Sequence, residues 1–256
     1  MKPMPAATLA RFVLLEARRS GLPWLALGCI ALSAGLAGFL SEVALTESRA
    51  LQAAVVAALL RASAVFLVAA HVASSTLREM NDKGLELMLT LPLSRATQYL
   101  GRLAGFGVLG ILVAAAFSAP LVLWAAPSAV ALWGLSLACE CALVAAAALF
   151  FAMTLAQLVP AIAATAGLYL LARSIATIQA IAGGPLAEPS LAGMAARWIV
   201  DAIALLLPRL DSVTRTEWLI YAPPAGGAYA AALAGLGLYA LLLVAAGLFD
   251  FQRKSL

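Results

Sequence analysis

Six long runs of apolar residues, almost free of charged side chains, constrain this chain more than any other feature. They cover approximately residues 21–41, 51–75, 103–124, 130–155, 161–182 and 227–249. Each run is about as long as the roughly 20 residues that an α-helix needs to cross the hydrocarbon core of a bilayer. The pattern predicts an all-α integral membrane protein with six transmembrane helices.

The composition excludes a water-soluble fold. Of the 256 residues, 64% are hydrophobic and 11% are charged, and the mean hydropathy is +1.02. Soluble domains are typically about half apolar and about a quarter charged. Lipid is therefore the expected solvent. We expect a single transmembrane domain over residues 1–256, with no soluble part large enough for an ATPase or a conventional enzyme.

The net charge of +4 comes from basic residues that cluster beside the apolar runs rather than in one tract. This distribution argues against a nucleic-acid partner and is the pattern that orients a membrane protein. With the N-terminus inside, ten basic residues face the cytoplasm and four face outward, which predicts that both termini are cytoplasmic. The ten are Lys2, Arg11, Arg18, Arg19, Arg78, Lys83, Arg95, Arg102, Arg253 and Lys254, and the four are Arg49, Arg197, Arg209 and Arg215.

Residues 6–20 form an amphipathic pattern ahead of the first span. Leu9 and Phe12 gather on one side of a helix, while Arg11 and Arg18 lie on the other. Such a helix binds in the plane of the headgroups. We therefore predict an N-terminal amphipathic elbow helix.

Three charged residues lie inside the predicted spans: Arg61, Glu140 and Arg173. Counting residues from the outer ends of their spans places all three roughly 13–15 Å below the outer boundary, at 1.5 Å per residue. An unpaired charge at that depth costs at least a few kcal/mol, so we expect Glu140 to pair with at least one arginine. The cluster is either part of a substrate pathway or gate, or a structural ion pair that fixes helix packing.

The segment 78–92, between the second and third spans, is too polar to cross the bilayer yet contains a short apolar run. A charged start, a glycine, an apolar helix and a proline follow one another. This order favours a rigid helix that docks on a cytoplasmic partner, although an ordinary interfacial loop helix is the simpler interpretation. The predicted contact residues are Glu79, Lys83, Gly84, Leu85, Glu86, Met88, Leu89 and Pro92.

The segment 183–226, after the fifth span, is expected on the outer side. Residues 191–207 are apolar enough to be counted as a seventh span, but Arg197 and Asp201 argue against a full crossing. These two residues lie four apart and so share one face of a helix. We expect a helix that dips into the outer leaflet and returns at Pro208.

The sequence contains no motif for catalysis or nucleotide binding. GxxxxGK[ST], HExxH and GxSxG are all absent. The only histidine, His71, lies in the second span and is expected to pack against neighbouring helices. Cys139 and Cys141 point to different faces of a helix, which disfavours a metal site. We expect no catalytic residue, no metal and no cofactor in this chain.

Part of the sequence resembles a known family. Glu79 and Gly84, followed by LMLTLPLSRATQYLGRLAG leading into the third span, resemble the permease subunits of ABC-2 type (type V) ABC transporters. The amphipathic N-terminal helix and the basic C-terminal tail match the same family. The stretch ALLLPRLDSVTRTEWLIYAPP before the last span resembles its branch that matures multi-copper enzymes such as nitrous oxide reductase. No Met- or His-rich tract marks a copper path, so other substrates stay open.

The resemblance implies the permease subunit of an ATP-driven exporter in the bacterial cytoplasmic (inner) membrane. Segment 78–92 is then the coupling helix that seats on a separate ABC-type ATPase subunit, which binds ATP and Mg²⁺. The permease is expected to pair with a second copy of itself or with a similar permease. Two other interpretations stay open: an integral membrane enzyme acting on lipid head groups, and a non-transporting assembly factor that anchors an ATPase.

Overall fold

The computed structural model describes residues 5–43, 48–82, 94–184, 191–213, 215, 217–220 and 226–253. These residues form helices and turns, and no strand occurs among them. Six of the helices are long and apolar enough to cross a membrane, which confirms the predicted number of spans. They are α2 (Leu22–Val43), α3 (Ser48–Asn81), α5 (Arg95–Ser118), α6 (Pro127–Leu155), α7 (Leu158–Ala182) and α10 (Gly226–Arg253).

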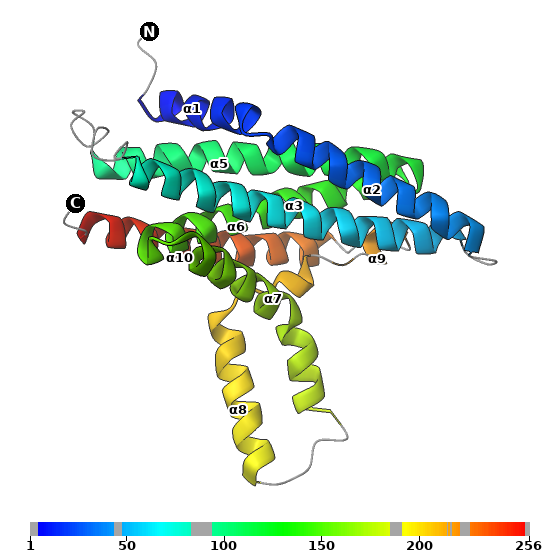
Figure 1. Cartoon of the computed structure of the whole chain (residues 1–256). Coiled ribbons are helices and arrows are strands. Elements are labelled where there is room, and N and C mark those ends of the chain that lie inside the picture. Colours follow the sequence, from blue (N-terminus) through cyan, green and yellow to red (C-terminus); the bar gives the residue numbers. More distant parts are fainter. Residues whose placement is uncertain are drawn as a thin grey trace.

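Apart from α7, whose last part points away from the others, the long helices pack into a bundle along one axis (Figure 1). The start of α1 (Pro5–Arg19) and the end of α10 lie at the same end of this bundle, as six crossings require. Arg95, the first residue of α5, donates hydrogen bonds of 3.4 Å to the carbonyl oxygens of Phe251 and Gln252 in the last turn of α10. We call this the terminal end of the bundle and the other the distal end.

α6 is the central helix and packs against α3, α5, α7 and α10. Residues 145–148 are four successive alanines, and all four are buried. Successive residues of a helix point about 100° apart, so this part of α6 is covered on every side. Small side chains allow such close packing within a membrane. The start of α6 also follows from its sequence, because Pro127 stands at its first position.

α1 is a helix, as predicted, and it runs alongside the first half of α5 (Figure 1). Two residues separate it from α2, and Gly21 between them has a φ of +81°. A positive φ is easily adopted by glycine, which suits a joint between two helices. The predicted position of α1 in the headgroup plane stays a prediction, as does the cytoplasmic location of the termini.

α3 is longer than the predicted second span, since it continues to Asn81. The first residues of the predicted coupling helix, including Glu79, therefore belong to the last turns of α3. α5 begins at Arg95, where Ser94 caps the helix by accepting a hydrogen bond of 3.1 Å from the backbone N–H of Thr97. Residues 83–93, which hold the other seven predicted partner contacts, lie outside the described residues.

Short 3₁₀ helices and one further short helix connect the long ones. η1 (Ala119–Leu123) follows α5, and η2 (Leu210–Ser212) and α9 (Glu217–Ile220) precede α10. The remaining helix, α8 (Leu191–Leu206), pairs with the last part of α7 in a hairpin that leaves the bundle at a steep angle (Figure 1).

The hairpin is held by polar contacts on the face of α8 that the sequence predicts to be polar. The side-chain amide of Gln179 on α7 donates a hydrogen bond of 2.8 Å to Asp201 on α8. A Cβ atom added at Gly183 would lie 3.6 Å from the guanidinium carbon of Arg197. Arg197 and Asp201 therefore both face α7. Because α8 does not run along the bundle axis, it adds no seventh crossing parallel to the others.

Candidate functional site

Two charged residues from different helices meet in the interior of the bundle. Nη1 of Arg61 on α3 donates a hydrogen bond of 2.5 Å to Oε2 of Glu140 on α6. The exposed fractions of the two residues are 1% and 0%. This contact confirms the predicted pairing of Glu140 with an arginine.

The equal depth of the two residues follows from the parallel course of α3 and α6. Arg61 comes thirteen residues after Ser48, where α3 begins, and Glu140 comes thirteen residues after Pro127, where α6 begins. Both helices start at the distal end (Figure 1). Because the rise per residue is fixed, the same number of residues brings Arg61 and Glu140 to the same level.

The third predicted member, Arg173 on α7, joins the cluster through the second oxygen of Glu140. Its Nη1 lies 3.5 Å from Oε1 of Glu140 and 3.2 Å from the hydroxyl of Tyr169. Tyr169 itself donates a hydrogen bond of 2.8 Å to the same carboxylate oxygen. The side chain of Arg173 is 33% exposed, so this arginine connects the buried carboxylate to the surface of the bundle.

Three members of the cluster were not predicted from the sequence. Nη2 of Arg61 donates a hydrogen bond of 3.0 Å to Ser136, and the guanidinium carbon lies 4.7 Å from the centre of the Trp133 ring. These members are Ser136, Trp133 and Tyr169, and helix periodicity offers a signal for them. Ser136 stands four residues before Glu140, and Tyr169 stands four residues before Arg173. Each therefore lies on the same helix face as its charged neighbour. Trp133 lies seven residues before Glu140, two turns away on that face.

The cluster has an excess of positive charge. It contains two guanidinium groups, and in the described part of the chain Glu140 is the one carboxylate that forms an ion pair with either. Chemically, the arrangement can fix three helices relative to one another, and its partly exposed arginine can attract an anion.

A second ion pair lies near the terminal end. Glu79 on α3 pairs with Arg102 on α5, and the side chain of Glu79 is 17% exposed. On α1, the carboxylate of Glu16 accepts a hydrogen bond of 2.8 Å from Ser75. Both carboxylates thus hold helices together within this chain. The predicted contact of Glu79 with an ATPase stays a prediction, and most of its side chain is buried within this chain.

His71 on α3 is buried and packs edge-on against the ring of Phe106 on α5, with ring centres 6.4 Å apart. This contact agrees with the predicted packing role. Among the described residues there is no group of three or more side chains suited to holding a metal ion.

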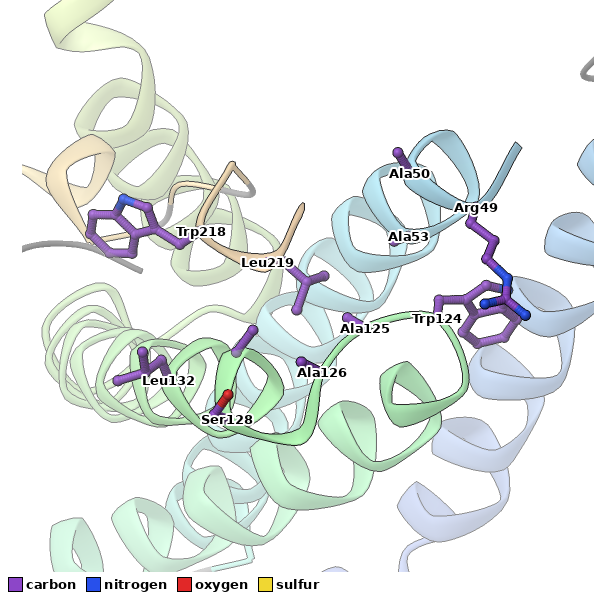
Figure 2. A pocket seen from close by; sticks show the side chains of 11 residues that line it. Arg49, Ala50, Ala53, Trp124, Ala125, Ala126, Ser128, Leu132, Trp218 and Leu219 are labelled. Carbon is purple, nitrogen blue, oxygen red and sulfur yellow. The ribbon is translucent and has the colours of Figure 1, made fainter. Parts of the chain in front are cut away.

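A cavity of about 570 Å³ opens at the distal end (Figure 2). Figure 2 shows Trp124 and Arg49 at one end of it and Trp218 at the other. Nε1 of Trp124 donates a hydrogen bond of 3.0 Å to Gln52, which fixes that ring. Arg49 is the single charged residue among the described lining residues. The cavity was not predicted, because its walls come from three segments that are far apart in the sequence.

No model of a known protein family matches the chain, and no curated protein sequence matches it.

Proposed function

We propose that this chain is the transmembrane permease subunit of an ATP-binding cassette exporter of the ABC-2 type, driven by a separate ATPase subunit. The observation that carries the proposal is the Arg61–Glu140–Arg173 cluster inside a bundle of six apolar helices. Ionisable residues are expensive within a membrane, and where they occur they commonly mark a path for a substrate or a switch.

The arrangement of helix ends supports a partner at the terminal end. The start of α1, the end of α3, the start of α5 and the end of α10 meet there (Figure 1). A protein that pushes on the segment between α3 and α5 acts directly on two spans at once. The ion pair of Glu79 with Arg102 joins these two spans next to that segment, so movement of one helix is passed to the other.

The buried cluster suits a helix rearrangement driven from that end. α3, α6 and α7 each contribute a charged residue, so a shift of one helix changes the distances among all three charges. Coupling to ATP hydrolysis requires that these contacts differ between two states of the bundle. The bundle is then the pathway or gate, and the ATPase provides the energy.

Copurification tests the proposal. The full chain, tagged and expressed in its native host, is expected to bring down a P-loop ATPase. Reversing two charges in the connecting segment, with Lys83→Glu and Glu86→Lys together, is expected to lower the recovered ATPase strongly. The matched control exchanges Arg197→Asp and Asp201→Arg on α8, which also preserves the net charge, and is expected to retain the ATPase. Recovery of the chain with no ATPase would contradict the proposal and favour a membrane enzyme.

A further inference from the structure

The segment that joins α8 to η2 lies at mid-height in the bundle, although it is not helical. Residues 207–209 lie outside both helices. Leu210 belongs to one buried apolar cluster with Leu143 of α6, and Pro208 lines a small hollow with the same two residues. Leu143 comes sixteen residues after Pro127, so it lies about 24 Å along a helix that is about 44 Å long. Irregular backbone therefore lies near the middle of the bilayer that the bundle spans.

This segment carries charged side chains at that depth. Arg209 is exposed on the outside of the bundle. Two residues further on, Oδ1 of Asp211 is buried and has no hydrogen-bond partner among the described residues. The hydrocarbon core extends about 15 Å to either side of its centre, farther than an arginine side chain reaches. Irregular backbone and charged residues at such depth face protein or a water-filled cavity. Lipid alone is therefore an unsuitable neighbour for this side of the chain.

A groove of about 320 Å³ contains Arg209 in its lining and separates α8 from α10. Leu205, at the end of α8, lies on one wall of it. That wall continues away from the bundle, because Trp198 stands two turns before Leu205 on the same helix face. Trp198 is 76% exposed and Leu205 is 88% exposed. Since α8 meets the bundle at a steep angle (Figure 1), α8 and α10 enclose an open corner.

Small residues form the other wall of this α8–α10 corner. Gly227, Ala231 and Gly235 follow one another along α10 at four-residue intervals, so they share one helix face, and all three are exposed. A Cβ atom added at Gly227 or Gly235 would meet no atom within 4 Å. In a membrane, a row of small residues lets a second helix approach closely. The wall therefore suits a helix, and none in the described part of this chain lies on it.

The chain carries both halves of a self-complementary contact. Copies of a membrane protein share one orientation, so a two-fold axis between two of them runs along the bundle axis. Rotation about that axis keeps each element at its own depth. The α7–α8 hairpin joins the bundle directly at the corner, so the hairpin of one copy meets the corner of the other at the same level.

We propose that a second copy of this chain covers this side, with α8 of each copy lying in the α8–α10 corner of the other. The contact removes Arg209 and Asp211 from lipid and buries Trp198 and Leu205, together with Leu238 on α10, which is 62% exposed. It depends on the chain lying in a bilayer and not on its proposed role in transport.

A leucine in the row of small residues tests the contact in the full chain. Gly235→Leu places a side chain in the corner at a position where a Cβ meets no atom of its own chain. The variant is expected to weaken dimerisation about tenfold or more, measured by sedimentation equilibrium in density-matched detergent. The matched control is Gly28→Leu on α2, which is equally exposed and open but lies on the other side of the bundle (Figure 1). It is expected to dimerise like the wild type.

Crosslinking in membranes locates the contact without disturbing it. Two differently tagged copies carry single cysteines, Trp198→Cys in one and Leu238→Cys in the other, with serine at the three native cysteines. A short thiol-specific crosslinker is expected to join these copies. Leu32→Cys on α2, which is 77% exposed, is the control and is expected to give no crosslink with Trp198→Cys.

Three outcomes would overturn the proposal. The first is a chain that stays monomeric in both detergent and membranes, which would assign Arg209 to a water-filled cavity or to a different protein. The second is equal weakening of the dimer by Gly235→Leu and Gly28→Leu. The third is a dimer that crosslinks through Leu32→Cys and not through Leu238→Cys, which would place the contact on α2.

Discussion

Gly105 on α5 lies so close to Val13 on α1 that a Cβ atom at Gly105 would be 2.8 Å from the Cβ of Val13. The same atom would be 3.0 Å from the Cα of Ala10, and a Cβ at Gly101 would be 3.0 Å from the side chain of Leu9. Glycines four residues apart form a smooth strip on which a second helix can rest. The strip holds α1 parallel to α5, because residues later in α1 meet residues later in α5.

Gly105→Ala is expected to destabilise the protein by about 1–3 kcal/mol, the usual range for overpacking a tight contact. The neighbouring backbone of α1 cannot move aside as a flexible side chain can, so α1 must separate from α5. Gly107→Ala on the same helix is the matched control, because no atom lies within 4 Å of a Cβ added there. Thermal unfolding in detergent compares the two variants. Equal melting temperatures would show that α1 does not rest on this strip.

A second close contact joins α5 to α10. Tyr99 is fully buried, and its hydroxyl lies directly against Gly247 and makes no hydrogen bond with the described residues. Gly247→Ala is therefore expected to destabilise by about 1–3 kcal/mol. Tyr99→Phe removes an oxygen that has no partner and is expected to be nearly neutral. The double variant is expected to recover part of the loss, and strict additivity of the two changes in thermal unfolding would contradict this contact.

The sequence was sufficient for the number of spans and for the pairing of Glu140. Both depend on position along a helix, which follows from a fixed rise per residue. Ser136 and Trp133 were not predicted, although both lie on the helix face of Glu140. The sequence does not show in which direction along α6 the long side chain of Arg61 extends, and that direction brings it to Ser136 and Trp133.

The course of α1 and the length of α3 were harder to predict for a different reason. The amphipathic pattern of α1 shows which side is apolar but not whether lipid or another helix covers it. The structure places α5 against part of that side, where Gly101 and Gly105 lie against Leu9 and Val13, whereas Phe12 remains 49% exposed. The last turns of α3 contain Arg78 and Glu79, and such polarity suggested that the span ends at residue 75 and that a separate cytoplasmic helix begins at residue 78. The ion pair of Glu79 with Arg102 offsets that polarity and lets the helix continue.

The predicted orientation can be tested by cysteine labelling. The background carries Ser in place of Cys29, Cys139 and Cys141. A cysteine at Ser128, which is exposed near the start of α6 at the distal end, is expected to react with an impermeant thiol reagent in intact cells. A cysteine at Ser94, which is exposed at the terminal end, is expected to react only after permeabilisation. The opposite pattern would place the termini outside and remove the basis for an ATPase at the terminal end.

The last prediction concerns the charges at Arg61 and Glu140. Glu140→Ala leaves the guanidinium of Arg61 buried without its carboxylate, and a loss of about 3–5 kcal/mol is expected, as for other broken buried pairs. Replacing Arg61 and Glu140 together by Leu removes both charges at once. The double variant is expected to be more stable than the single one, because no unpaired charge remains between them.

The same variants separate a role in transport from a role in packing. Tyr169→Phe removes one hydrogen bond to Glu140 while keeping both ion pairs, so it serves as the matched control and is expected to cost about 1.5–3 kcal/mol. Thermal unfolding measures stability, and ATP-dependent export in vesicles with the copurified ATPase measures function. A stable double variant that exports nothing assigns the charges to the pathway, whereas normal export assigns them to the scaffold. A double variant less stable than Glu140→Ala would contradict the pairing itself, since removal of both partners must then cost more than leaving one unpaired.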